Sequence, residues 1–190
     1  MKKVLLLMMI LFTAVGAGMA QQNKQDEKAA RKAEKAAKKA AEEASEMAMF
    51  EEAVKALEAK DFVLEAERVE FKRGNFAYVT PSTNFVSLAG EQAVIQLAFN
   101  GVFSGPNGLG GITVEGTATH IEMNRDKRGN VSFSMMVQGT AVSAQVTFRM
   151  MKGTSRCSVT VSPNFNSNRL TFTGRLYPTE LSNVFQGRTF

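Results

Sequence analysis

The sequence predicts a mainly β protein (α+β overall): an antiparallel β-barrel or β-sandwich of about eight or nine strands, preceded by a long N-terminal helix. Short stretches of alternating apolar and polar residues recur after residue 61, and Gly, Asn or Pro turns separate them. Residues 21–44 consist almost entirely of Ala, Lys, Glu, Gln and Arg, which favour helix. We therefore divide the chain into residues 1–20, a helix or tether over residues 21–60, and one β domain over residues 61–190.

The first 20 residues have the layout of a secretory signal peptide. Lys2 and Lys3 precede a nearly unbroken apolar run over residues 4–15, and small residues follow up to Ala20. A membrane anchor is the alternative, but the run is shorter than the roughly 20 apolar residues that span a bilayer. We expect cleavage after Ala20 and a periplasmic or secreted product with no transmembrane segment. No cysteine follows the run, so a lipoprotein anchor is excluded.

The remaining chain is mildly basic. Without Lys2 and Lys3, 21 Lys and Arg stand against 18 Asp and Glu, an excess too small to indicate a nucleic-acid-binding protein. The excess is uneven, because eight Lys or Arg and a single acid, Glu180, follow from Lys127 onward. This basic part forms either a solvated face or a surface for anionic polymers of the cell envelope.

The predicted helix contains two kinds of apolar stripe. Alanines at three- and four-residue steps form a possible coiled-coil seam: Ala33, Ala37, Ala40 and Ala44. Because an alanine seam lacks large apolar side chains, this part is either a solvated tether or an oligomerising helix. Larger apolar residues then follow at helical spacing and should pack on the β domain: Met47, Phe50, Val54 and Leu57.

Alternation in the β domain predicts which side chains point inward. Phe62, Leu64 and Ala66 alternate, and the pattern continues on the opposite parity at Val69, which indicates a bulge near residues 67–68. Three further runs predict inward faces: Ala93, Ile95 and Leu97; Ala144, Val146, Phe148 and Met150; Cys157, Val159 and Val161. Gln92 and Gln96 lie on the side opposite the first of these runs.

A Gly-rich stretch over residues 100–116 separates two of the alternating runs. It holds six glycines, which tolerate positive φ and allow close approach, so it forms either a wide turn or a binding loop. It lacks the Gly-Lys-Ser or Gly-Lys-Thr ending of a phosphate loop, and a strand follows it. The candidate binding residues are Asn100, Pro106, Asn107, Gly108, Gly110 and Gly111.

The residues of the β domain predict no catalytic site, no metal site and no cofactor. His120 is the single histidine and Cys157 the single cysteine, whereas zinc-type sites need several such ligands. We expect Cys157 to be a buried small hydrophobe, because it shares parity with apolar neighbours. A glycosidase would need two paired carboxylates, and the spacing of the acids selects no pair.

Several segments carry a family resemblance. They read DFVLEAERVEFKRG, TNFVSL, VIQLAF, GPNGLGGITVEG, DKRGNVSFSM and VSPNFNSNRLTFTGRLYP. Together they resemble the domain of unknown function family 4251, exported proteins of Bacteroides-like bacteria, over about residues 50–188. The resemblance implies export and one β-rich domain, and it implies no activity, ligand or catalytic residue.

The leading hypothesis is an exported, non-enzymatic β domain that binds a small ligand, a glycan or an envelope partner. One alternative is a structural or assembly protein that forms homo-oligomers through its N-terminal helix. The other is a hydrolase that acts on envelope polysaccharide.

Overall fold

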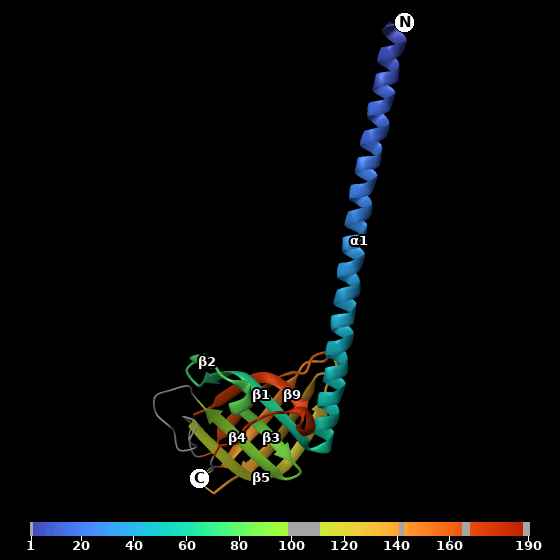
Figure 1. The fold of residues 1–190 in the computed structure, drawn as a ribbon. Helices are drawn as coiled ribbons and strands as arrows, with labels where there is room; N and C mark the ends of the chain where they lie inside the picture. The colour runs from blue at the N-terminus through green and yellow to red at the C-terminus, as the bar shows by residue number, and fades with distance from the viewer. Residues whose placement is uncertain (1, 99–110, 141–142, 165–167, 188–190) are drawn as a thin grey trace. The chain divides into compact units, whose positions relative to one another are not determined.

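The computed structural model describes residues 2–98, 111–140, 143–164 and 168–187, with side chains from residue 27 onward. In these residues one helix, α1 (Lys2–Ala59), precedes the strands, as Figure 1 shows. The strands are β1 (Asp61–Phe71), β2 (Phe76–Tyr78), β3 (Phe85–Ala89), β4 (Gln92–Ala98), β5 (Gly111–Arg125), β6 (Val131–Gln138), β7 (Ser143–Met150), β8 (Arg156–Pro163) and β9 (Leu170–Pro178).

The strands form a closed antiparallel barrel. From β3 to β9 each strand pairs with the next, β3 also pairs with β1, and β9 pairs with β1. Eight strands therefore close the wall, and β2 is an extra strand on β1. The predicted barrel with a preceding helix is confirmed, and the sandwich is not formed.

Two bulges bend the wall. The register between β1 and β9 shifts between Ala66 and Arg68, which confirms the predicted bulge. A second shift lies between Thr119 and Glu122, where His120 has a φ of 50° and an exposed side chain. The phase change around His120 in the sequence is therefore a bulge, which turns the imidazole to solvent.

Apolar side chains fill the barrel. Three rings pack edge to face at its centre, since the Phe62 centroid lies 5.3 Å from Phe133 and 5.1 Å from Phe148. The inward faces predicted from alternation on β7 and β8 are confirmed: Ala144, Val146, Phe148, Met150, Cys157, Val159 and Val161 are all buried. The interior of the described barrel is thus a packed core.

The chain forms two compact units, Met1–Ser45 and Glu46–Phe190. In the first, every described side chain, from residue 27 to 45, is exposed, and Lys39 pairs with Glu43 one turn later. The side chains of the predicted signal peptide lie outside the described residues. Among the side chains that are described, no helical stretch is long and apolar enough to cross a bilayer.

In the second unit the last turns of α1 pack on the barrel. Phe50, Val54 and Leu57 are buried in the barrel core, as predicted, whereas Met47 remains 37% exposed. The Cε atom of Met47 nevertheless approaches the barrel, 3.7 Å from the position that a Cβ on Gly153 would take.

An ion pair fastens this end of the helix to β9. Arg175 Nη2 donates to Glu46 Oε1 at 2.9 Å, and Thr154 Oγ1 donates to Glu46 Oε2 at 3.1 Å. The hydrogen bond from Arg175 is the main cause that holds the pKa of Glu46 below its ordinary value. The contribution of this bond to stability is therefore present above the ordinary carboxyl pKa and is lost as the pH falls through the lowered pKa.

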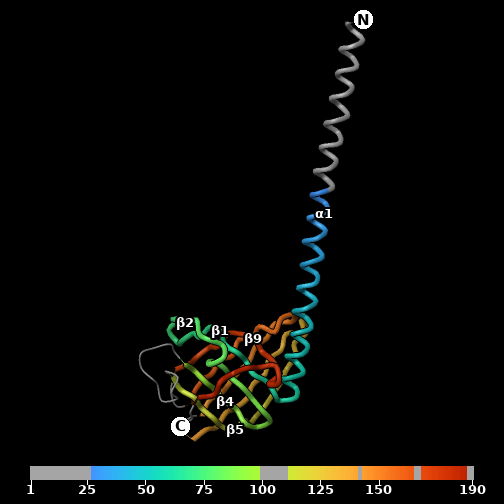
Figure 2. Tube along the Cα trace, viewed as in Figure 1, coloured from blue at the N-terminus to red at the C-terminus, as the bar shows by residue number. Residues whose placement is uncertain are grey.

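The C-terminal segment, residues 182–187, covers part of the outer wall. In Figure 2 this red segment runs across the front of β4. Beneath it lie three buried apolar side chains that are separate from the main core: Val63, Phe85 and Val94. Val184 of the segment packs on these three side chains.

Gln96 anchors the segment. The sequence placed it opposite the inward face, and it does lie on the outer side, yet it is fully buried. Its Nε2 donates to the carbonyls of Thr83 (2.9 Å) and Phe185 (2.7 Å), and its Oε1 accepts from Thr113 Oγ1 (2.9 Å) and Gly187 N (2.7 Å). All four hydrogen-bonding positions of the amide are used. This part of the outer wall is therefore occupied by the chain itself.

Candidate functional site

Five of the six candidate binding residues in the Gly-rich stretch lie outside the described residues: Asn100, Pro106, Asn107, Gly108 and Gly110. Gly111 begins β5 opposite Ala98, and a Cβ there would lie 1.8 Å from the Leu97 carbonyl oxygen. The close approach of the two strands therefore explains this glycine without a ligand.

Cys157 lies inside the barrel. Its side chain is 2% exposed, and burial raises the pKa of the thiol to about 12. A reactive cysteine needs an accessible, electropositive setting. The prediction of a buried small hydrophobe is confirmed.

The thiol should accordingly be inert in the folded protein. A pKa of about 12 in place of 9.0 lowers the thiolate fraction about a thousandfold at pH 8. We expect no reaction with 5,5′-dithiobis(2-nitrobenzoate) in native buffer and stoichiometric reaction in guanidinium chloride. Labelling of the native protein at the rate of free glutathione would contradict this assignment.

The described residues hold no cluster of metal-ligating side chains. No group of three or more His, Cys, Asp or Glu is placed to hold a metal ion in the part of the chain that the structure describes. In the same part, no Asp or Glu is among the fully buried side chains.

Small polar side chains line the outer wall of β6 to β9. Directly paired residues of antiparallel strands share a face. One row across the four strands is Ser132, Arg149, Ser158 and Thr173, and the next is Ser134, Thr147, Thr160 and Thr171. All three neighbours of Arg149 in its row are thus hydroxyl residues.

A groove of about 680 Å³ lies over the first row. Its wall includes the whole row, together with Arg156 and the turn residues Asp126 and Asn130. Met151, which is 70% exposed, lies at the same groove. We call this feature, defined by Ser132, Arg149, Arg156, Ser158 and Thr173, the Arg149 groove.

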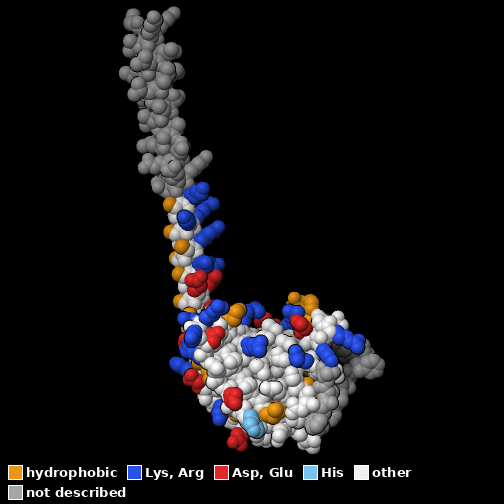
Figure 3. All heavy atoms as spheres, turned by 180° about the vertical axis from the view of Figure 1, so that it is seen from behind, with side chains coloured by type: hydrophobic (Ala, Val, Ile, Leu, Met, Phe, Trp, Pro, Cys, Tyr) orange, Lys and Arg blue, Asp and Glu red, His pale blue; other side chains and the backbone are white. Residues whose placement is uncertain are grey.

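Among the described residues that line it, the groove has two arginines and one carboxylate. Arg156 pairs with Glu67 at 3.5 Å, whereas no carboxylate among the described residues lies within ion-pairing distance of Arg149. Figure 3 shows Lys and Arg side chains, together with several Asp and Glu side chains, spread over one face of the barrel. The Arg149 guanidinium is therefore available to an anion.

Asp126, the single carboxylate among the described residues that line the groove, is held in its turn. Its Oδ1 accepts from the backbone amides of Arg128 (2.8 Å) and Asn130 (2.9 Å), and its Oδ2 accepts from Asn130 Nδ2 at 2.8 Å. The Asn130 side chain is the largest cause that lowers the pKa of Asp126. The Asp126 carboxylate therefore stays ionised and stabilises its own turn.

The alternation that predicts Phe148 and Val159 inward implies that Arg149, Ser158 and Thr160 point outward, but it does not bring them together. Their strand positions follow from alternation, whereas the row depends on the register between strands that are separated by turns. The eight basic residues from Lys127 onward were the one signal for this surface.

Comparison with known proteins identifies relatives by family and by structure. The model of the family described as "Domain of unknown function (DUF4251)" matches residues 44–176, which is more than half of the chain. A crystal structure of a DUF4251 family protein from Bacteroides eggerthii is 44% identical, with a TM-score of 0.65. The match covers 78% of this chain and 99% of that one. No curated protein matches the chain. The chain thus belongs to the DUF4251 family.

Proposed function

We propose that this protein is an exported, non-enzymatic barrel that binds an anionic glycan in the Arg149 groove. The observation that carries the proposal is the guanidinium of Arg149, which has no ion-pair partner among the described residues and lies in a groove whose lining combines three hydroxyl residues with apolar side chains. Export rests on the signal-peptide layout of residues 1–20.

The chemistry of the groove suits an acidic sugar. A guanidinium offers planar, paired N–H donors that match a carboxylate, sulfate or phosphate group. Hydroxyls both donate and accept, so Ser132, Ser158 and Thr173 can bond the hydroxyls of a sugar ring on either side of the anion. Neutral sugars would leave the Arg149 charge unpaired, and the groove should therefore prefer an anionic glycan.

The carboxylates argue for binding without hydrolysis. Glycosidases place two carboxyl groups about 5–9.5 Å apart across the scissile bond. Asp126 is one carboxylate at the groove, and three hydrogen bonds from its own turn engage it. No second Asp or Glu lines the groove among the described residues.

Calorimetric titration tests the proposal. The probes are a galacturonate hexamer and a neutral hexamer of galactose, and the variants are Arg149→Gln and Arg128→Gln. Arg128 lies in the neighbouring turn outside the groove lining, so both variants lose one positive charge. Because hydrogen bonds to charged groups contribute about 1.5–3 kcal/mol, Arg149→Gln should weaken hexamer binding at least tenfold.

The Arg128→Gln control shows whether a loss of affinity in Arg149→Gln is specific to the groove. Arg128→Gln should retain galacturonate affinity within about twofold, since it changes only the long-range field. Equal losses in the two variants would reduce the effect to general charge attraction and overturn the groove. Tight binding of the neutral hexamer would overturn the role of the anion, and cleavage of either probe, followed by mass spectrometry, would overturn the non-enzymatic assignment.

A further inference from the structure

The extra strand β2 exposes two aromatic rings. Phe76 is 52% exposed and Tyr78 is 80% exposed. Their rings meet edge to face, with centroids 5.7 Å apart. The two adjacent exposed rings form an apolar patch, which makes β2 a candidate contact site.

Arg68 of β1 fixes this pair in place. Its guanidinium carbon lies 4.2 Å from the centroid of the Phe76 ring, and its Nη2 donates to Glu70 Oε2 at 2.9 Å. A cation over a ring is worth about 0.5–1 kcal/mol at an exposed site. We call Phe76, Tyr78 and Arg68 the aromatic platform, and it is ordered before any ligand arrives.

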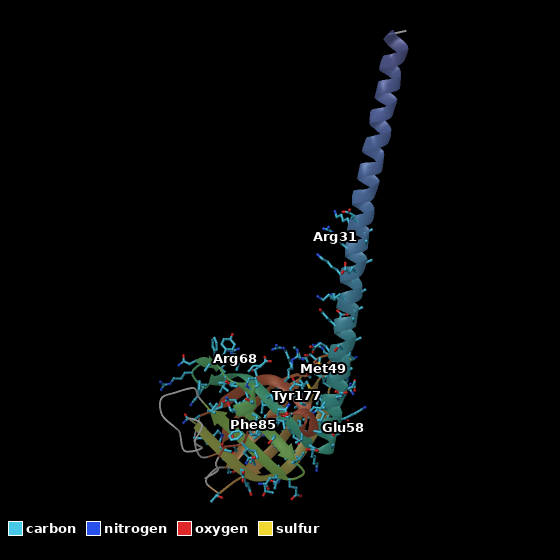
Figure 4. The ribbon with its side chains drawn as sticks, viewed as in Figure 1. Arg31, Met49, Glu58, Arg68, Phe85 and Tyr177 are labelled. Carbon is cyan, nitrogen blue, oxygen red and sulfur yellow. The ribbon has the colours of Figure 1, made fainter. Side chains whose placement is uncertain are left out.

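The aromatic platform continues the row of the Arg149 groove. Arg68 pairs with Tyr78 on one side and with Thr173 on the other, and Thr173 lines the groove. Paired residues share a face, so Tyr78, Arg68, Thr173, Ser158 and Arg149 form one line across five strands. Four steps between neighbouring strands span about 19 Å. Figure 4 shows Arg68 beside β2.

We propose that the aromatic platform is a second subsite for the same ligand, which is therefore an oligosaccharide and not a single acidic sugar. This inference rests on the proposed function of the Arg149 groove. One sugar presents its acid to Arg149, and another, several units along the chain, lays its apolar C–H face on Tyr78. An aromatic ring with a polar tip suits a surface that is apolar on one face and wet at its edge.

The charges along this row favour an anionic oligosaccharide as the ligand. Arg68, Arg156 and Arg149 lie at or beside the row, and the carboxylates nearest to two of them are Glu70 and Glu67, which those arginines already engage. Of these three arginines, Arg149 alone has no ion-pair partner among the described residues, so the anionic group of the oligosaccharide is expected there, with the hydroxyls of the row beside it. The ring pair at one end then adds contact area without adding charge.

Tyrosine emission offers a direct probe. The chain has no Trp and only two Tyr, so the variant Tyr177→Phe leaves Tyr78 as its sole tyrosine. Titration with galacturonate monomer and galacturonate hexamer should change the Tyr78 emission only with the hexamer. In calorimetry, Phe76→Ser should weaken hexamer binding about tenfold and leave monomer binding unchanged.

A matched control separates the platform from general hydrophobicity. Phe185 is 62% exposed and lies on the C-terminal segment, so Phe185→Ser removes an exposed ring elsewhere. It should retain hexamer affinity within about twofold. Arg149→Gln should weaken monomer and hexamer alike, because it removes the anion contact that both share.

The outcomes distinguish the two ideas. If Arg149→Gln weakens both probes but Phe76→Ser changes neither, the platform inference fails and the groove stands. If neither probe binds the wild-type protein, both fail. If Phe76→Ser instead abolishes a concentration-dependent dimer in sedimentation velocity, with hexamer affinity unchanged, a second copy of the chain occupies the platform and the inference is overturned.

Discussion

Gly174→Val should leave the protein unfolded or destabilised by at least about 4 kcal/mol in the free energy of unfolding. A Cβ at residue 174 would lie 1.8 Å from the carbonyl oxygen of Glu65 and 2.9 Å from the Ala66 Cα. Both contacts are with backbone atoms next to the bulge in β1, so no side-chain rotation relieves them. The strands could separate only by breaking the β1–β9 pairing that closes the barrel.

Urea unfolding followed by circular dichroism measures this effect. Thr171→Val is the matched control, because it places the same β-branched side chain on β9 at an outward, half-buried position. The control should stay within about 1 kcal/mol of the wild type, since valine favours strands. A Gly174→Val protein with wild-type stability would show that β1 and β9 approach less closely than described here.

Phe62→Ala should lower the free energy of unfolding by about 3–5 kcal/mol. Phe62 is fully buried and makes edge-to-face contacts with both Phe133 and Phe148. Removal of the ring loses its transfer free energy and leaves a cavity between two other rings, which also contact one another at 5.6 Å. The barrel wall cannot collapse into that space because its hydrogen-bonded strands fix its diameter.

Phe62→Leu separates the two parts of that loss. Leucine keeps most of the buried apolar volume and loses the two aromatic contacts, so we expect a destabilisation of about 1–2 kcal/mol. Denaturant midpoints for the two variants give the comparison. Equal destabilisation by Ala and Leu would mean that ring geometry, and not filled volume, dominates at this position.

Local pattern was enough to predict the elements and the inward faces. The alternation around Phe148 selected the buried side of β7, and the parity change after Ala66 located the bulge. Both are features of neighbouring residues, for which the two-residue period of a strand suffices. The predicted helical stripe was correct at Phe50 and Leu57 because the 3.6-residue period of a helix is likewise a feature of nearby residues.

Features that depend on distant partners could not be predicted. The choice between barrel and sandwich depends on whether the first and last long strands pair, and no sequence pattern within either strand reveals this pairing. Gln96 is outward by period yet buried, because a C-terminal segment without alternation covers it. The row through Arg149 likewise exists only through strand register. The Gly-rich stretch was predicted as a candidate binding loop from its composition. At Gly111, its one described candidate residue, the close approach of the Leu97 carbonyl explains why the residue is glycine.

The closure of the barrel has a consequence for the time course of folding. The partners that β1 finds on β9 stand between 99 and 116 positions later in the chain, from Phe71 with Leu170 to Phe62 with Pro178. Contacts between such distant residues form slowly, because loop-closure entropy must be overcome first. A nascent chain therefore holds the apolar face of β1 without its final partner until β9 has been made. The barrel should close only after β9 has emerged from the ribosome, and a chain that stops short of β9 should be held by chaperones or degraded.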